Sequence, residues 1–226
     1  PIDRAEAERW ASDAAETARQ RIEQVAAVAD RQRPEVRDRI ARISQQRDRL
    51  LERFGQLRTL PQTGIRKIRL HGDFHLGQTL WTGQDFVIFD FEGEPAIPLT
   101  ERRQKRPVLK DIAGMLRSFD YAAFAGGTSS AARTGIAPSM LAEYQTAWRD
   151  AARAAFLDAY LGTVRAAPVR LVPERAVDLD GLLGVFELEK AIYELAYEAN
   201  NRPTWVEIPL AAVEAALAGD ESSDRR

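Results

Sequence analysis

Apolar residues in the first sixty positions recur at the spacing of amphipathic helices. Between residues 3 and 30 they fall at Trp10, Ala14, Ala18, Ile22, Val25 and Val28. A second run covers residues 35–58, behind Pro34, a residue suited to a first helical turn. We therefore predict a helical hairpin over residues 1–58. It either packs on its own domain or forms a partner-binding coiled coil, although neither helix keeps a strict heptad.

The spacing of the apolar residues changes from a helical to an alternating pattern in the middle of the chain. Three short runs alternate polar and apolar residues as strands do: 67–70, 79–81 and 85–91. Thr82-Gly83-Gln84 has the composition of a turn between the last two runs. Because strand side chains alternate, Asp90 is expected on the opposite face from Phe89 and Phe91. This pattern predicts a small β-hairpin insert in a mainly α-helical fold.

The remaining chain is predicted to be helices joined by loops. Residues 94–110 form a loop that holds Arg102, Arg103, Lys105 and Arg106, which is either a substrate loop or a solvated turn. Helices are expected from Asp111, with a break at the glycine-rich 125–131, then over 138–160, 177–200 and 209–217, with 203–209 extended. We predict one domain, 1–218, with parts 1–58, 66–94 and 111–217, and a disordered tail, 219–226.

Composition excludes several classes of protein. The 226 residues carry a net charge of −2, so no basic field draws the chain to nucleic acid or a membrane surface. There is no cysteine, which excludes disulfides and thiolate catalysis and is typical of a reducing compartment. No apolar run reaches the roughly 18 residues of a spanning helix. We expect a cytoplasmic protein.

The candidate chemistry lies in residues 71–94, which hold both histidines of the chain, His71 and His75. Two histidines four residues apart, with Asp73 between them, are one form of metal site. The zinc pattern with this spacing lies on a helix, however, whereas Gly72 and the flanking strands here indicate a loop. A histidine metal site is therefore the less favoured interpretation.

Phosphoryl transfer is the favoured interpretation. Protein kinases place a base Asp in a tight loop, a metal-binding amide five residues later, and a second Asp beyond the next strand. Here Asp73 lies in the loop, Gln78 follows after five residues, and Asp90 ends a predicted strand. Carboxylate and amide oxygens suit Mg²⁺.

The segment HGDFHLGQ resembles the H-G-D-x-H-x-x-N motif of aminoglycoside phosphotransferase-like kinases. Together with FDFEGEP and ERRQKRPVLKDIAGMLRSFDYAA, it resembles the bacterial maltokinases over about 50 residues. The resemblance implies the C-lobe of a protein-kinase-like fold, ATP as donor, maltose as acceptor, and a place in trehalose and glycogen metabolism. Some members are fused behind trehalose synthase.

The resemblance also assigns roles. Asp73 would be the catalytic base and His71 would brace its loop. Gln78, where most of the superfamily has Asn, would bind Mg²⁺ with Asp90, and Glu92 would assist. Asp111 would hydrogen-bond the catalytic loop from below, although the sequence pattern also allows it to cap its helix.

A sugar site is predicted on the last long helix. Five residues follow the spacing of one helical face, and two more follow at once: Lys190, Tyr193, Glu194, Tyr197, Glu198, then Arg202 and Trp205. Aromatic faces and hydrogen-bonding groups suit a sugar. The alternative is a surface helix whose tyrosines pack and whose charges pair. The resemblance favours the sugar interpretation, because the maltose site of the family lies in this lobe.

Before His71 there is no Gly-rich loop and no lysine-bearing strand of the kind that binds ATP in kinases. The chain also begins with Pro1. We therefore expect an upstream N-terminal lobe, with little activity in the chain alone. Two alternatives remain open: an amino-sugar or aminoglycoside phosphotransferase lobe, favoured by an acidic pocket, and a non-catalytic sugar-binding or regulatory module.

Overall fold

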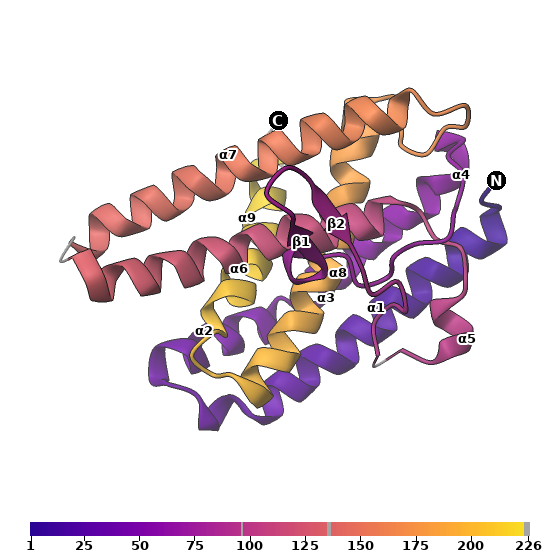
Figure 1. Ribbon diagram of the computed structural model, residues 1–226. Coiled ribbons are helices and arrows are strands. Elements are labelled where there is room, and N and C mark those ends of the chain that lie inside the picture. The colour runs from indigo at the N-terminus through magenta and orange to yellow at the C-terminus, as the bar shows by residue number, and fades with distance from the viewer. Residues whose placement is uncertain (96, 135–136, 224–226) are drawn as a thin grey trace. The chain divides into compact units, whose positions relative to one another are not determined.

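Helices make up most of the chain, with one two-stranded antiparallel sheet (Figure 1). This computed structural model describes residues 1–95, 97–134 and 137–223. The chain divides into two compact units. The first contains Pro1–Gly64 and Glu174–Arg226, and the second contains Ile65–Pro173. The division separates the parts predicted as one sugar-binding region, 111–217, because its first two helices belong to the second unit and its last two to the first.

The first unit opens with the predicted helix. It begins where the Asp3 carboxylate accepts a hydrogen bond from the Glu6 backbone N–H at 2.8 Å. The second predicted helix is wrong as one element, because the backbone leaves α-helical geometry at Gln46 and tightens to a 3₁₀ turn from Phe54. The elements are α1 Arg4–Ala27, η1 Ala29–Arg31, α2 Pro34–Gln45, α3 Arg47–Arg53, η2 Phe54–Thr59 and α4 Leu60–Thr63.

Two later helices, α8 Ala176–Asn201 and α9 Glu207–Ser223, complete the first unit. Ala18, Ile22 and Val25 of the predicted stripe are buried and its other three members are half-buried. Leu50 and Phe54 are buried as well, so the N-terminal helices pack within their own unit. A buried hydrogen bond from Gln32 Nε2 to the Ala199 carbonyl, 2.9 Å long, joins the two parts of the chain. Burial of this stripe is what the intramolecular interpretation of the hairpin requires.

The C-terminal segment differs from its prediction. Residues 203–209 are not extended, because α9 begins at Glu207, and residues 219–223 continue this helix. Apolar residues Ile208, Leu210, Val213 and Leu217 are buried on α9, and their helical spacing explains its early start. The last three residues of the predicted tail lie outside the described part of the chain.

The hairpin of the second unit consists of β1 Thr79–Trp81 and β2 Phe86–Ile88. Thr79 pairs with Ile88 and Trp81 with Phe86, and the Trp81 and Phe86 rings lie 4.9 Å apart. Strand β2 is shorter than predicted because Asp90 adopts a φ of +63°, which leaves the extended region. The predicted strand at 67–70 contributes only the isolated bridge between Ile68 and Arg106.

Helices of the second unit follow the hairpin: α5 Leu99–Arg102, α6 Leu109–Thr134 and α7 Pro138–Arg165. Figure 1 shows α6 and α7 running side by side in opposite directions. The break predicted at 125–131 is wrong, because α6 continues through Gly126 and Gly127. A Cβ on Gly127 would lie 2.7 Å from Cγ of Gln145 on α7, so the glycine allows the two helices to approach closely. Within the described part of the chain, no helix has the length and apolarity needed to cross a bilayer.

Candidate active site

The loop that begins at His71 is held by a carboxylate forty residues further along the chain. Asp111, in the first turn of α6, accepts a hydrogen bond from the His71 backbone N–H at 2.8 Å and from the Gly72 N–H at 3.0 Å. Helix α6 begins two residues before Asp111, so Asp111 is not its N-cap. Its carboxylate supports the loop instead, which is the geometry that the family resemblance implied.

Burial makes Asp111 an unusual carboxylate. Desolvation raises the pKa of Asp111 above its ordinary value, although the two N–H donors and nearby positive charge act in the opposite direction. Burial, together with the charge of Asp111, also raises the pKa of Tyr160 on α7 to about 12. The loop therefore rests on a buried group that is costly to ionise, with a tyrosine in its electrostatic field.

His71 joins the loop to the segment that follows β2. Its ring is buried, with Nε2 2.8 Å from the Phe89 carbonyl oxygen. Nδ1 accepts from the Asp73 backbone N–H at 3.4 Å, which assigns the proton to Nε2. Phe74 and Phe91 pack around the ring, at centroid distances of 5.6 and 4.8 Å. These contacts suit the bracing role predicted for His71.

Asp73 is accompanied by the second histidine. His75 Nε2 lies 3.5 Å from Asp73 Oδ2, and the Asp73 side chain is only 16% exposed. His75 Nδ1 accepts from the Gly77 backbone N–H at 3.0 Å, so Nε2 carries the proton that faces the carboxylate. The favoured phosphoryl-transfer interpretation of the sequence gave His75 no chemical role. Its spacing of two residues from Asp73 was the only signal that they meet.

The hairpin brings Gln78 and Asp90 together. Gln78 Nε2 donates to Asp90 Oδ2 at 3.1 Å, although twelve residues separate them in the chain. Asp90 has a φ of +63° and is the only non-glycine residue with positive φ in the described part of the chain. Such a backbone costs on the order of 1–3 kcal/mol and is concentrated at functional sites. The strained turn directs Asp90 to the amide that the motif predicts as its partner.

Magnesium fits Gln78 and Asp90 but not a larger cluster. Among the described residues, no three His, Asp or Glu side chains are placed to hold a metal ion, so Glu92 does not complete a cluster with Asp73 and Asp90. Mg²⁺ commonly uses only one or two protein oxygens and takes the rest from phosphate and water. An amide and an exposed carboxylate supply that donor set.

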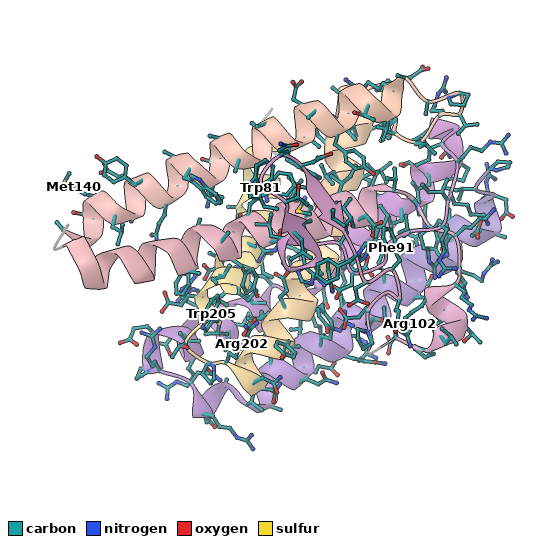
Figure 2. The ribbon with its side chains drawn as sticks, viewed as in Figure 1. Trp81, Phe91, Arg102, Met140, Arg202 and Trp205 are labelled. Atoms are coloured by element: carbon teal, nitrogen blue, oxygen red, sulfur yellow. The ribbon has the colours of Figure 1, made fainter. Side chains whose placement is uncertain are left out.

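The predicted sugar residues belong to the first unit. Glu198 is 1% exposed and forms two hydrogen bonds to Arg202, from Nε at 2.9 Å and from Nη2 at 2.5 Å. The Arg202 guanidinium also lies 5.4 Å from the Tyr197 ring centroid and 5.2 Å from that of Trp205 (Figure 2). These four residues form one cluster at the end of α8, which we call the Arg202 cluster.

Three further predicted residues lie nearer the middle of α8. The Lys190 ammonium is 4.9 Å from the Tyr193 ring centroid, and the guanidinium of Arg21 on α1 is 4.7 Å from the same ring. Glu194, like Glu198, is buried, whereas Tyr197 is 45% exposed, so the predicted face holds both buried carboxylates and an exposed ring. Tyr193 therefore has two cations near its ring.

Known proteins that resemble the chain are sugar kinases. No family model matches it. The chain is 32% identical over 161 residues to a glucosamine kinase of Streptacidiphilus jiangxiensis, a match that covers 71% of this chain and 34% of the relative. It is also 32% identical over 154 residues to a glucosamine kinase of Mycolicibacterium smegmatis, covering 68% and 35%. The chain thus matches about a third of the length of these curated relatives.

Solved structures give the same result. A glucosamine kinase in complex with glucosamine, ADP and inorganic phosphate has a TM-score of 0.74 and 25% identity, covering 100% of this chain and 51% of that one. Another crystal form has a TM-score of 0.73 and 26% identity, covering 97% and 48%. The homologues are therefore glucosamine kinases, and the chain has the fold of about half of such an enzyme. The maltokinase assignment and the trehalose synthase fusion stay predictions.

Proposed function

We propose that this chain is the base- and metal-bearing part of an ATP-dependent sugar kinase whose acceptor is an amino sugar of the glucosamine class. The observation that carries the proposal is the matching of the whole chain to solved glucosamine kinases, together with Asp73, Gln78 and Asp90 at the kinase spacing. The contacts of Asp111, His71 and Gln78 then describe how such a site is built.

In this proposal Asp73 orients the acceptor hydroxyl and takes its proton. A general base contributes about 10²- to 10⁴-fold in rate. His71 and Asp111 fix the loop that carries it, since both bind its backbone. Gln78 and Asp90 would hold Mg²⁺, which neutralises charge on the transferred phosphoryl group when bound. Glu92, which is exposed, is a weaker candidate for that role.

The acceptor is proposed from the relatives and from the chemistry of the Arg202 cluster. Glucosamine carries an ammonium group, which carboxylates bind, and its ring offers an apolar face for aromatic residues. In the cluster, Glu198 supplies a carboxylate and Tyr197 and Trp205 supply the rings, and Glu194, four residues before Glu198 on α8, supplies a second carboxylate. Maltose is the second candidate, favoured by the FDFEGEP and ERRQKRPVLKDIAGMLRSF segments. It has no ammonium group and needs only the hydroxyl contacts.

The nucleotide is proposed to be held mainly by a lobe outside these 226 residues. The chain covers about half of the solved relatives, one of which is bound to ADP. A lysine-bearing nucleotide lobe is the part of a kinase that this sequence lacks before His71. Turnover experiments therefore use the complete kinase, in which that lobe accompanies this chain. The trehalose synthase partner is proposed only for the maltose alternative.

Replacement of Asp73 tests the proposal. We expect Asp73→Asn to lower kcat for glucosamine phosphorylation by about 10³-fold, with an unchanged unfolding midpoint, because the carboxylate that supports the loop belongs to Asp111. Asp85→Asn, the same change on an exposed turn of the hairpin, is the matched control and should keep full activity.

Each assay is run with glucosamine, maltose and an aminoglycoside as acceptors. Preference for maltose or the aminoglycoside would replace the proposed substrate with that alternative. Near-normal turnover by Asp73→Asn would overturn the assignment of the base. A wild-type kinase that binds glucosamine without phosphorylating it would instead show a non-catalytic sugar-binding module.

A further inference from the structure

The basic segment 99–106 contacts the chain on both sides of the candidate site. At one end, Arg106 and Ile68 exchange backbone hydrogen bonds of 3.0 and 2.9 Å, three residues before His71. In the middle of the segment, Arg102 Nη1 donates to the Glu92 carbonyl at 3.2 Å, two residues after Asp90. One short segment therefore binds both the stretch that leads into the Asp73 loop and the turn that follows Asp90.

The two loops meet through their backbones at a pair of glycines. Gly72 has a φ of +86° and Gly93 a φ of +80°. A Cβ on Gly72 would lie 3.2 Å from the Gly93 Cα, and a Cβ on Gly93 would lie 3.5 Å from the His71 carbonyl oxygen. The same Cβ on Gly93 would lie 3.3 Å from Arg102 Cδ. The Arg102 stem thus packs against the glycine joint (Figure 2 labels Arg102).

Arg102 is not fully satisfied in this position. Its Nε is buried and has no hydrogen-bond partner among the described residues. A buried donor without an acceptor costs about 1–3 kcal/mol. Stability alone therefore gives little reason for a guanidinium here, since an apolar stem would pack against Gly93 without that cost. Its distinguishing contribution is the charged donor on the Glu92 carbonyl.

We propose that Arg102 is a positioning residue that sets the distance between the Asp90 turn and the Asp73 loop and so determines metal affinity. The inference rests on the proposed function, in which Asp90 and Gln78 hold the metal. Arg102 acts through the backbone: it fixes the Glu92 carbonyl and covers Gly93, which packs on Gly72. Without it, the turn that carries Asp90 loses the hydrogen bond that Arg102 Nη1 donates to the Glu92 carbonyl.

Binding of Mn²⁺, measured by the electron paramagnetic resonance of the free ion, tests this without requiring turnover. We expect Arg102→Met, which keeps the aliphatic stem, to weaken Mn²⁺ binding by the 226-residue chain about tenfold, as loss of outer supports of metal sites does. Arg102→Lys should recover most of the affinity. Arg103→Met, at the next and exposed position, is the charge-matched control and should bind normally.

The complete kinase supplies a second readout. Arg102→Met should raise the Mg²⁺ concentration for half-maximal rate about tenfold, with little change in KM for sugar and an unfolding midpoint close to that of Arg103→Met. Equal metal affinity in the two Met variants, or no Mn²⁺ binding by the unaltered chain, would overturn the inference. The complete kinase could also fail to phosphorylate any sugar while Arg102→Met still binds Mn²⁺ more weakly than Arg103→Met. That outcome would contradict the proposed function and support the role of Arg102.

Discussion

Asp111 shows how a single buried residue organises the candidate site. Its two oxygens accept from two successive backbone N–H groups, an arrangement that favours the ionised carboxylate. Burial nevertheless raises its pKa, so the folded protein binds the Asp111 proton more tightly than the unfolded chain does. The carboxylate therefore positions the loop at a cost to stability near neutral pH.

This pKa shift has a definite sign in the stability of the protein. As pH falls from neutrality through the raised pKa toward the ordinary value of 3.8, the folded state takes up the proton first. Asp111 therefore contributes increasing stability on acidification over that window. Urea unfolding of wild type and Asp111→Asn between pH 7 and about pH 4 measures this effect. The free energy of unfolding of the wild type should rise relative to that of the variant as pH falls. A constant or opposite difference would contradict the assignment.

At the scale of elements, the site depends on how two loops join rather than on either loop alone. The hairpin carries Gln78 and Asp90 to each other, and the turn after β2 returns the chain to Gly72. Both glycines at this joint have positive φ, and at Gly72 a side chain would also press on the neighbouring backbone. A turn glycine in the hairpin, Gly83, has a φ of +94° but nothing within 4 Å of its Cβ position.

Comparing Gly72→Ala with Gly83→Ala distinguishes the effect of backbone strain from the effect of the close contact between Gly72 and Gly93. Each should cost about 1–2 kcal/mol of stability, because each forces alanine into a left-handed conformation. Only Gly72→Ala should also shift the Asp73 loop against the Asp90 turn, and we expect it to lower kcat about 100-fold, as small misplacements of reacting groups do. Equal activity of the two variants in a steady-state kinase assay would show that the close contact is unimportant.

At the scale of the whole molecule, the two units carry different parts of the proposed function. The base and metal residues belong to the second unit, and the predicted sugar residues belong to the first. Substitutions in the second unit should therefore change turnover and metal binding, and substitutions in the first unit should change the KM for sugar. Tyr197 is suited to this test, because it is 45% exposed and its removal leaves the buried Glu198 with its Arg202 partner.

We expect Tyr197→Ala to raise KM for glucosamine about tenfold, since an aromatic contact contributes on the order of 1 kcal/mol. Mn²⁺ binding and the unfolding midpoint should not change. Trp81→Ala, which removes an exposed aromatic residue of the hairpin, is the control in the second unit and should leave the sugar KM unaltered. An unchanged KM for Tyr197→Ala would favour the alternative in which the α8 tyrosines only pack.

Much of the secondary structure could be predicted because its signals are local. The spacing of apolar residues located α1, α7 and α8 within a few residues, and alternation located β1. Predictions failed where tertiary contacts overrule local preference. Gly126 and Gly127 indicated a break, yet α6 continues through both, and the missing side chain of Gly127 leaves room for Gln145 of α7. Strand β2 ends early because Asp90 is held in a left-handed turn, which no periodicity reveals.

The sequence by itself determined the candidate chemistry: Asp73, Gln78 and Asp90 at kinase spacing, because residues of one loop and one hairpin are fixed by positions close in the chain. It also led to a sugar kinase, a class that the homologues share, with maltose as the favoured acceptor and an amino sugar as the alternative, and these homologues are glucosamine kinases. The family resemblance had already implied Asp111 beneath the loop, whereas the tertiary structure alone placed His75 beside Asp73 and Arg102 behind Gly93. These contacts either join segments that are distant in the chain or depend on the direction of a side chain. Tertiary packing determines both of these features.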